Sequence, residues 1–335
     1  MDPVSHAAFG YTVVRAACPA VPRIAAAAFA GALAPDVDAV FMPAGWDVYL
    51  RVHELGAHTL IGIAPVALAV AYGVRGRTRA PILPLFQAAW LAAASHLGLD
   101  VISGARLQLG WPVVPGRSLV PLVAMAEPWV IALLVLGLGA LALFRHQIQK
   151  AAQCVILIFA VCLVVKGVWL VQALGTLRPE TFGSMQARVV EAQWFSLREW
   201  NVFGRMDSQL TRVSIRPDRE PRVVGSWPID SDFPLAETSR RLDTVRNLLA
   251  VHELTFARLL PAADGTTEVL WSDVRFCWMP PSDSPPATTR GLLAIGTGPK
   301  RIACALWFGG IYDDAGRAIS QRVRVFGVWQ TRPAP

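Results

Sequence analysis

Long apolar segments fill most of the first half of the chain. A membrane-spanning helix needs about 20 mostly apolar residues, and four segments approach or exceed that length, the last interrupted only by Lys166. Two weaker segments precede these four, and the second of them carries Asp36 and Asp38 near its end. The pattern predicts about six membrane-spanning helices, at residues 4–18, 24–42, 55–74, 82–103, 128–144 and 151–174.

The second half shows shorter patterns that are typical of a soluble domain. Between residues 236 and 260, apolar side chains recur at helical spacing, which predicts a helix there. These side chains are Leu242, Val245, Leu248, Leu249 and Phe256. Strand-like runs follow at 268–278, 301–310 and 321–330, with a turn at 313–316 between the last two. The fold class expected is an all-α polytopic membrane domain over residues 1–176, followed by a smaller soluble α+β domain over residues 181–335.

The charge content supports this division. Only 16% of the residues are charged, against about 25% in an ordinary soluble protein, and a disordered chain would be richer in charge. Residues 1–180 hold 12 basic and 8 acidic side chains, whereas the shorter stretch 181–335 holds 19 and 16. The net charge of +7 is spread over both halves. Because there is no basic block, we expect no nucleic-acid partner.

Basic residues between the segments predict the orientation, since cytoplasmic loops are enriched in Lys and Arg. If six segments alternate, one side holds seven such residues, namely Arg15, Arg23, Arg75, Arg77, Arg79, Arg145 and Lys150. The other side holds three, namely Arg51, Arg106 and Arg117. We therefore expect a multi-pass membrane protein with the N-terminus and the soluble domain outside the cytoplasm, which in a bacterium means the periplasm or the cell exterior. The opening residues do not form a cleavable signal peptide, so the first segment is expected to remain in the mature protein.

The ionisable side chains of the membrane half gather on one side. Such residues are costly inside a bilayer and are functional candidates for that reason. Under the six-segment topology, eight of them lie at the outer ends of the segments, namely His6, Asp36, Asp38, His53, His58, His96, Asp100 and Glu127. Each alone has an ordinary structural explanation, as a packing residue or at a helix end. Eight on one face favour a single site.

The residue types and spacing indicate a metal site. His96 and Asp100 are four residues apart, so they face the same side of one helix and can bind one ion. Asp36 and Asp38 fall where a helix ends, which lets both turn inward. Imidazole and carboxylate suit zinc, manganese or iron, and the lack of nearby Cys in the sequence argues against a Cys-type zinc site or an iron–sulfur cluster. The metal ligands expected are His6, Asp36, Asp38, His53, His58, His96 and Asp100.

Four short motifs resemble, in order, those of the YdjM/YfhP-type family of bacterial inner-membrane proteins. The family pattern is D-P-x-T-H, P-D-x-D, H-R-G-x-T-H-S and S-H-x-x-x-D, and it corresponds here to residues 2–6, 35–38, 53–59 and 95–100. The resemblance is strongest over residues 1–130, and residues 269–276 resemble part of the soluble tail of some members. It implies a LexA-regulated, membrane-bound, metal-dependent hydrolase. A more distant likeness to zinc-dependent phospholipase C and P1-type nucleases implies phosphoester chemistry by analogy alone.

One departure from the family pattern affects the expected chemistry. Residues 53–59 are His-Glu-Leu-Gly-Ala-His-Thr, so both His residues keep their separation while the Arg-Gly pair is replaced and Ser becomes Thr. Metal binding is compatible with this change, but an Arg that would hold an anionic substrate is missing. The change gives weight to the alternative of a non-catalytic membrane protein with a structural or sensory metal site and a partner-binding soluble domain.

The expected function is hydrolysis of an ester or phosphoester, including a lipid-like one, by a metal-activated water. The cofactor expected is a divalent metal, zinc in the first place, with manganese or iron as alternatives. Glu127 and Asp38 are the candidate general bases. The expected partners are the membrane lipid bilayer and a small-molecule or lipid-like substrate. A proton- or ion-coupled transporter is the least favoured alternative, because the sequence shows no sign of an inverted repeat.

The five Cys residues divide between the two halves. Cys18, Cys154 and Cys162 lie in predicted membrane segments and are expected to pack as small apolar side chains. Cys277 and Cys304 lie on two predicted strands of the soluble domain. An extracytoplasmic location would allow a disulfide between them, but we favour two buried thiols.

Overall fold

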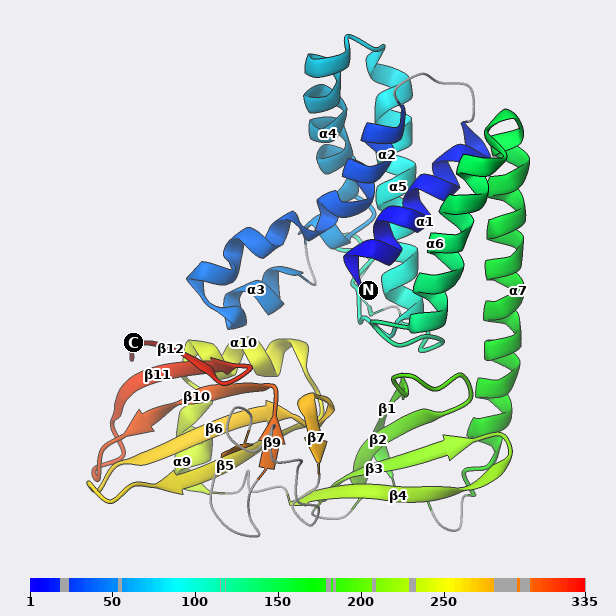
Figure 1. The fold of residues 1–335 in the computed structure, drawn as a ribbon. Helices are drawn as coiled ribbons and strands as arrows, with labels where there is room; N and C mark the ends of the chain where they lie inside the picture. Colours follow the sequence, from blue (N-terminus) through cyan, green and yellow to red (C-terminus); the bar gives the residue numbers. More distant parts are fainter. Residues whose placement is uncertain are drawn as a thin grey trace.

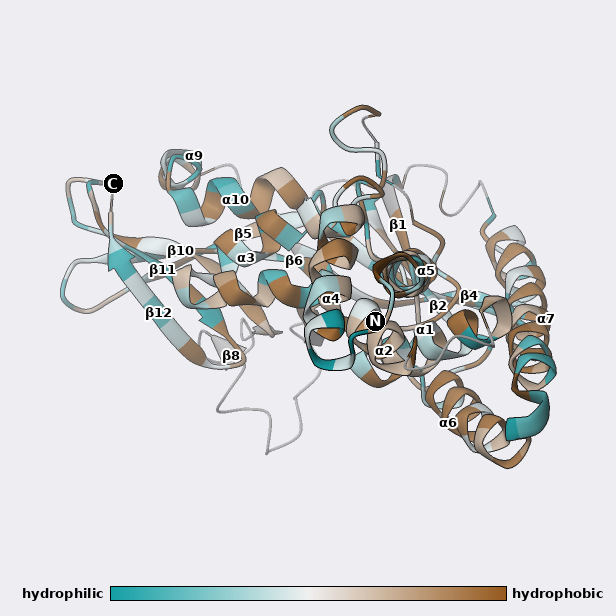
Figure 2. Ribbon diagram, turned by 90° about the horizontal axis from the view of Figure 1, so that it is seen from above, coloured by the Kyte–Doolittle hydropathy of each residue, from teal (hydrophilic) through white to brown (hydrophobic). Residues whose placement is uncertain are grey.

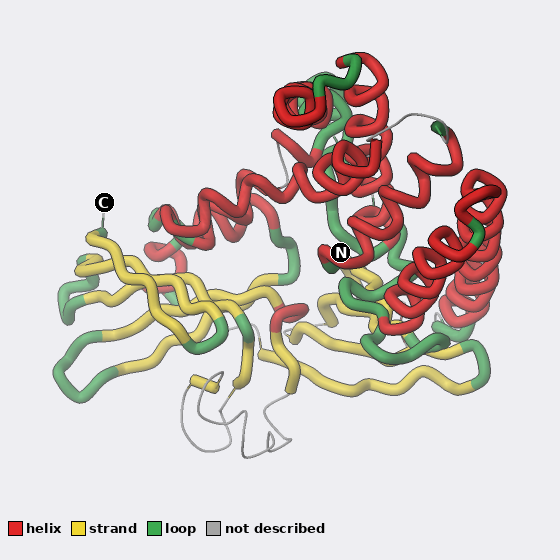
Figure 3. The backbone as a smooth tube through the Cα atoms, turned by 45° about the horizontal axis from the view of Figure 1, so that its top comes forward, coloured by secondary structure: helices red, strands yellow, loops and turns green. Residues whose placement is uncertain are grey.

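The computed structural model describes residues 1–18, 24–53, 56–114, 116–117, 119–178, 182, 185–206, 209–228, 233–279, 294–295 and 302–334. Helices make up the first half of the chain and strands most of the second (Figure 1). The helices gather on one side of the molecule and the sheets on the other (Figure 3). The expected order, a helical region followed by a domain built on antiparallel sheets, is therefore confirmed.

Each of the six predicted membrane segments contains a helix. The helical region consists of α1 (Pro3–Ala17), α2 (Ile24–Leu33), η1 (Ala34–Ala44), α3 (Trp46–His53), η2 (Gly56–His58), α4 (Ile63–Thr78), α5 (Ile82–Ile102), α6 (Pro128–Leu143), η3 (Arg145–Gln147) and α7 (Ile148–Gly175), where η marks a 3-10 helix. Apolar residues cover α6 and α7, and the turn between them is hydrophilic (Figure 2).

The count of six membrane spans is not confirmed. In the described part of the chain, three stretches are long and apolar enough to cross a membrane, namely Ile24–Ala44, Ile82–Ile102 and Arg145–Gly175. The bent pair Trp46–His58 and Ile63–Thr78 makes a fourth if it counts as one span. The 15 residues of α1 and the 16 of α6 correspond to helices of about 22 and 24 Å, short of a hydrocarbon core of about 30 Å.

Small residues hold the helices around α5 close together. Their shared core is rich in buried alanines, among them Ala28, Ala32 and Ala89. A Cβ on Gly31 would lie 2.5 Å from the carbonyl oxygen of Ala89, so a glycine here lets α2 approach α5 more closely than any other residue would. This approach sets the end of α2 against the part of α5 that carries His96.

The described residues of the second half form three antiparallel sheets, two short α-helices and one 3-10 helix. The strands β1 (Gln186–Ala192), β2 (Trp200–Met206), β3 (Gln209–Arg216) and β4 (Arg219–Pro228) form a meander in sequence order. A five-stranded sheet has the order β12-β11-β10-β6-β5, and a small sheet has the order β7-β9-β8. The remaining bounds are α9 (Pro234–Ser239), α10 (Asp243–Val251), β5 (Thr255–Pro261), β6 (Thr267–Asp273), η4 (Val274–Phe276), β7 (Cys277–Met279), β8 (Ala294–Ile295), β9 (Ile302–Cys304), β10 (Leu306–Tyr312), β11 (Ala318–Val325) and β12 (Val328–Pro333).

The meander and the five-stranded sheet share a core. Phe203 and Trp227 from the meander pack in one buried cluster with Phe256 and Trp307 from the larger sheet. A second core forms where α10 covers the five-stranded sheet, and it includes Leu248. We call residues 185–334 of this structure the C-terminal domain.

Three expectations for this domain are wrong in detail. The run 268–278 is not one strand, because the 3-10 helix η4 separates β6 from β7. The helix expected over 236–260 ends at Val251, and Thr255–Pro261 is a strand. The run 321–330 is a hairpin of two strands, joined at Phe326 and Gly327, which both have positive φ. The turn at 313–316 is confirmed, because the Gly316 N–H donates to the carbonyl of Asp313. The β1–β4 meander was not among the expected elements.

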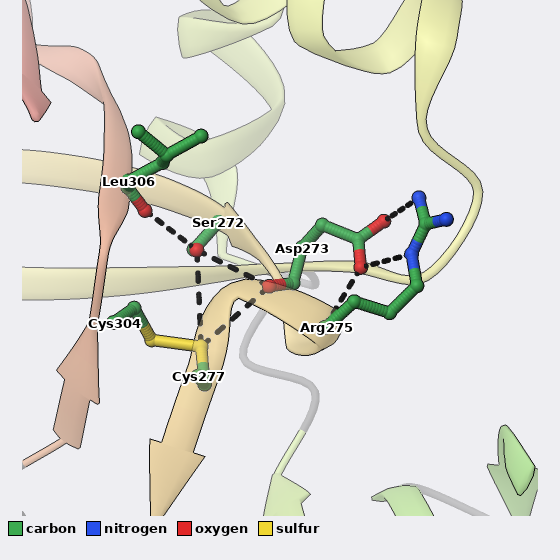
Figure 4. The surroundings of a disulfide bond; sticks show 6 residues. All are labelled: Ser272, Asp273, Arg275, Cys277, Cys304 and Leu306. Atoms are coloured by element: carbon green, nitrogen blue, oxygen red, sulfur yellow. Dashed lines mark hydrogen bonds and ion pairs between the residues drawn. A yellow bond between two sulfur atoms is a disulfide. The ribbon is translucent and has the colours of Figure 1, made fainter. Parts of the chain in front are cut away.

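A disulfide joins Cys277 on β7 to Cys304 on β9 (Figure 4). The expectation of two buried thiols is therefore wrong, because antiparallel pairing places the two residues directly opposite each other. Ser272 lies beside the bond and donates to the carbonyl of Leu306 at 2.7 Å. The other three cysteines are free.

A buried charged network lies next to the disulfide. Arg275 donates two hydrogen bonds of 2.8 Å to the carboxylate of Asp273. Its Nη2 also donates to Nδ1 of His252 at 2.6 Å. This ring nitrogen must therefore be an acceptor, which makes the ring neutral. Burial lowers the pKa of His252 to about 4, and the Asp273 charge opposes this shift.

The three basic residues of the predicted outer loops all contact the C-terminal domain. The pairs are Arg51 with the Asn247 side chain (3.0 Å), Arg106 with Glu253 (2.7 Å) and Arg117 with the Ala250 carbonyl (2.8 Å). In addition, the Trp200 indole donates to the carbonyl of Pro121 at 2.9 Å. The C-terminal domain therefore lies at the end of the helical region where the loops of these three residues are.

Candidate metal centre

Seven of the eight ionisable residues that were expected to gather are brought together by the fold. We call them the His/Asp cluster: His6 on α1, Asp36 and Asp38 on η1, His53 at the end of α3, His58 on η2, and His96 and Asp100 on α5. Contacts of 3.7 Å or less link all seven. Five of the side chains are buried. The side chains of Asp36 and His53 are 36% and 25% exposed, so the cluster is open at these two residues.

Four donor atoms form the centre of the cluster, and we call them the four-donor core. His58 Nε2 lies 3.3 Å from His96 Nε2 and 3.5 Å from Asp36 Oδ1. Its distance to Asp100 Oδ2 is 3.7 Å. His96 Nε2 lies 3.6 Å from Asp36 Oδ1 and 3.1 Å from Asp100 Oδ2. The five distances thus fall within a narrow range.

These distances fit donors arranged around one divalent ion. Zinc binds imidazole and carboxylate at about 2.0–2.1 Å in tetrahedral geometry, which separates two ligand atoms by about 3.3–3.4 Å. The five distances in the core lie between 3.1 and 3.7 Å. Two imidazoles and two carboxylates are also a donor set that zinc, manganese or iron accepts. The residues present therefore fit a divalent metal ion.

A backbone contact orients the His96 ring. Its Nδ1 lies 2.7 Å from the carbonyl oxygen of Ala32. Because a carbonyl only accepts, Nδ1 carries the proton and Nε2 presents a lone pair to the core. Metal-binding His residues commonly donate their other ring nitrogen in this way. The tight packing at Gly31 brings Ala32 to this place, and the His6 ring stacks on His96 with centroids 3.6 Å apart.

The remaining cluster residues surround the core on two sides. Asp38 Oδ2 lies 2.9 Å from His53 Nδ1 and 3.1 Å from His58 Nδ1. On the other side, His6 Nε2 lies 3.2 Å from Asp100 Oδ1, and the amino nitrogen of Met1 also contacts this oxygen. Two sets of donor atoms result, each within 4.8 Å, namely His6, His96 and Asp100, and Asp36, His53 and His58.

Two polar atoms of the cluster are buried without a hydrogen-bond partner among the described residues. They are Nδ1 of His6 and Oδ1 of Asp38. A buried polar atom left unpaired costs about 1–3 kcal/mol. Such atoms are expected where donors face an ion, so they support the fit of the cluster to a metal.

Glu127 lies outside the His/Asp cluster. It precedes α6, is buried, and accepts from the Ala124 N–H at 3.1 Å. Its carboxylate is 3.6 Å from the ammonium of Lys166 on α7, which also lies over the rings of Trp129 and Trp200. The pair explains the charge within the apolar α7. A catalytic role for Glu127 stays a prediction.

Two further parts of the site escaped the sequence reasoning. Tyr49 lies four residues before His53 on α3, and the centroids of their rings are 5.1 Å apart. Its helical spacing from His53 is a signal that would have found it. The carbonyl of Ala32 gives no side-chain signal, since any residue supplies the same group.

Comparison with known families gives a match over the helical half of the chain. Residues 1–173 match the family described as YdjM inner membrane protein. The matched range contains the whole His/Asp cluster and ends before the C-terminal domain. Comparisons with curated proteins and with solved structures give no match. Because the family match covers more than half of the 335 residues, the chain belongs to the YdjM inner membrane protein family.

Proposed function

We propose that this protein is a membrane-bound, metal-dependent hydrolase that acts on an ester or phosphoester. The observation that carries the proposal is the four-donor core, in which the two imidazole nitrogens lie 3.3 Å apart and each lies 3.1–3.7 Å from both carboxylate oxygens. Zinc is the ion we favour, because this donor set and spacing suit it, with manganese and iron as alternatives.

The residues of the four-donor core have two tasks in this proposal. His58, His96 and Asp100 are buried and would hold the ion. A bound divalent ion lowers the pKa of a water molecule and polarises the scissile bond. Asp36 is the most exposed donor, so the substrate would approach the core from its side.

Asp38 is better placed than Glu127 to accept a proton from the attacking water. Its Oδ2 holds the His53 ring at 2.9 Å. Its Oδ1 is buried, without a hydrogen-bond partner in the described part of the chain, and therefore free to accept. The Glu127 carboxylate is instead paired with Lys166.

The surface around Asp36 supports a lipid-like substrate. Leu33, Val37 and Val40 are exposed apolar residues next to Asp36, with Val40 71% exposed. They belong to Ile24–Ala44, a stretch long and apolar enough to cross a membrane. In a bilayer such an exposed apolar face contacts acyl chains. A lipid-like substrate would thus reach Asp36 without first crossing water.

We propose that the C-terminal domain faces away from the cytoplasm. Two observations support this orientation: the excess of basic residues in the opposite loops, and the disulfide, a bond that persists in oxidising compartments. In spheroplasts of an expressing bacterium, added protease should digest the domain. Protection until the membrane is permeabilised would contradict the orientation.

Hydrolysis by the full-length protein in detergent tests the proposed activity. We expect cleavage of bis(p-nitrophenyl) phosphate or of phospholipid in mixed micelles, lost with a chelator and restored by zinc or manganese. His96→Ala with Asp100→Ala should abolish it, whereas His146→Ala, a matched change in η3 outside the cluster, should not. Activity that survives chelation, or equal activity of the two variants, would contradict the proposal.

A structural or sensory ion is the second candidate function. It is favoured by the presence of four protein donors in the core, since a site closed by four protein ligands is typical of structural zinc. Residues 54 and 55, which replace the Arg-Gly pair of the family motif, lie outside the described residues. This alternative predicts a bound ion whose removal lowers the melting temperature, with no hydrolysis of either substrate.

A further inference from the structure

The C-terminal domain packs against α3, the short helix that ends in His53, and hydrogen bonds to it. Figure 1 shows α3 lying over α10, and the two helices are in contact. The Asp47 carboxylate on α3 is fully buried, and it accepts from Asn247 at 2.9 Å and from Arg332 at 2.7 Å. Arg51 donates in turn to the side-chain oxygen of Asn247 at 3.0 Å. Asn247 therefore uses both ends of its amide to hold α3.

Further contacts hold the first residues of α3 against the same domain. Trp46 and Leu50 pack against the core of the five-stranded sheet. The backbone N–H of Trp46 donates to the side-chain oxygen of Gln330, and the Arg332 side chain donates to the carbonyl of Ala44 just before α3. The contacts are thus apolar and polar, and they come from α10, β11 and β12.

The far end of α3 belongs to the His/Asp cluster. His53 is the last residue of the helix, and its Nδ1 lies 2.9 Å from Asp38 Oδ2. An eight-residue helix is far too short to be stable alone, so its position depends on what it packs against. The position of the His53 ring therefore depends on the contacts that Asp47 and Asn247 make.

We propose that the C-terminal domain completes the metal centre, with Asp47, Asn247 and Arg332 as positioning residues for His53. This residue offers a ligand atom that lies within 4.8 Å of those of Asp36 and His58, so it can share an ion with these two members of the four-donor core. This inference rests on the proposed function, since it requires that the His/Asp cluster binds an ion. It assigns a role to a domain that lies beyond the family match. Loss of a group that orients a metal ligand typically weakens metal binding by 10- to 100-fold.

Asn247→Ala in the full-length protein tests the inference, with Asn201→Ala as its matched control. The two asparagines are similarly buried, at 7% and 5% exposed, and the side-chain partners of Asn201 are Gln193 and Arg212, within the C-terminal domain. We would measure the dissociation constant for zinc by competition with a chromogenic chelator, together with the melting temperature. Asn247→Ala should raise the constant by about 10- to 100-fold, and Asn201→Ala should leave it unchanged even where it lowers the melting temperature.

A double variant tests whether the effect passes through His53. If Asn247 acts by positioning this ligand, His53→Ala with Asn247→Ala should bind zinc as His53→Ala alone does. Additive losses, or equal zinc constants for Asn247→Ala and Asn201→Ala, would overturn the positioning role and leave the metal site standing. A wild-type protein that binds none of zinc, manganese and iron would overturn the proposed function, and this inference with it.

Discussion

The disulfide between Cys277 and Cys304 should contribute much of the stability of the C-terminal domain. The two residues are 27 positions apart, and closing a loop of this size reduces the entropy of the unfolded chain by an amount worth roughly 3.5 kcal/mol at 25 °C. For a domain of about 150 residues, each kcal/mol changes the melting temperature by about 2–4 °C. Cys277→Ser with Cys304→Ser should therefore lower it by roughly 7–14 °C.

Two measurements on the full-length protein decide this prediction. Thiol titration in denaturant should find three thiols without reductant, namely Cys18, Cys154 and Cys162, and five after reduction. Thermal unfolding, followed by the fluorescence of buried residues such as Trp227 and Trp307, should show the lower melting temperature. Cys154→Ser is the matched control and should leave it unchanged. Five thiols without reductant would refute the bond, and three thiols with an unchanged melting temperature would refute the entropy argument.

Three other predictions concern buried groups. Lys166→Met leaves the buried carboxylate of Glu127 without its partner and should destabilise the protein by roughly 3–5 kcal/mol; a double variant that also carries Glu127→Gln should unfold at a higher temperature than the single one, and the opposite order would refute the pairing. His252 has a pKa of about 4 in the folded domain against 6.5 unfolded, so only the unfolded chain takes up its proton between these values. The free energy of unfolding should therefore fall by roughly 3 kcal/mol as the pH drops through this window. His252→Asn should remove that part of the pH dependence, and parallel curves of unfolding free energy against pH for the wild type and the variant would contradict the prediction. Gly31→Ala places a Cβ 2.5 Å from the carbonyl of Ala89, so it should push α2 from α5 and weaken zinc binding; an unchanged dissociation constant would refute this link.

The members of the His/Asp cluster could be predicted because short-range rules place them. Helical spacing alone brings His96 and Asp100 together, and they lie 3.1 Å apart. The end of α2 before Pro35 lets both Asp36 and Asp38 reach the cluster. Alternation of the segments then puts the remaining His residues at the same end.

The same reasoning misplaced Glu127, because a shared membrane face does not determine which neighbour a side chain meets. Its partner Lys166 lies on α7, and the packing of α6 against α7 brings the two side chains together. The docking of α3 was equally out of reach, since Asp47 and Asn247 are 200 residues apart. Contacts of this kind depend on tertiary packing that no local pattern encodes.

The C-terminal domain was predicted less completely than the helical region. Phe256 follows Leu249 by seven residues, which is close to two helical turns, so the periodicity does not reveal that the helix ends at Val251. Residues 255–261 form a strand instead, in which Phe256 packs against Trp307 in the core shared by the two sheets. The disulfide likewise depends on the register of β7 and β9, which the spacing of the two cysteines cannot supply.

The metal content of the purified full-length protein tests the central claim most directly. We expect at least one zinc, manganese or iron ion per chain after removal of loosely bound metal. His58→Ala with His96→Ala removes both imidazoles of the four-donor core and should abolish this binding, whereas His146→Ala should retain it. A wild-type protein that holds no metal, or equal metal content in the double variant and the control, would contradict the claim that these residues form a metal centre.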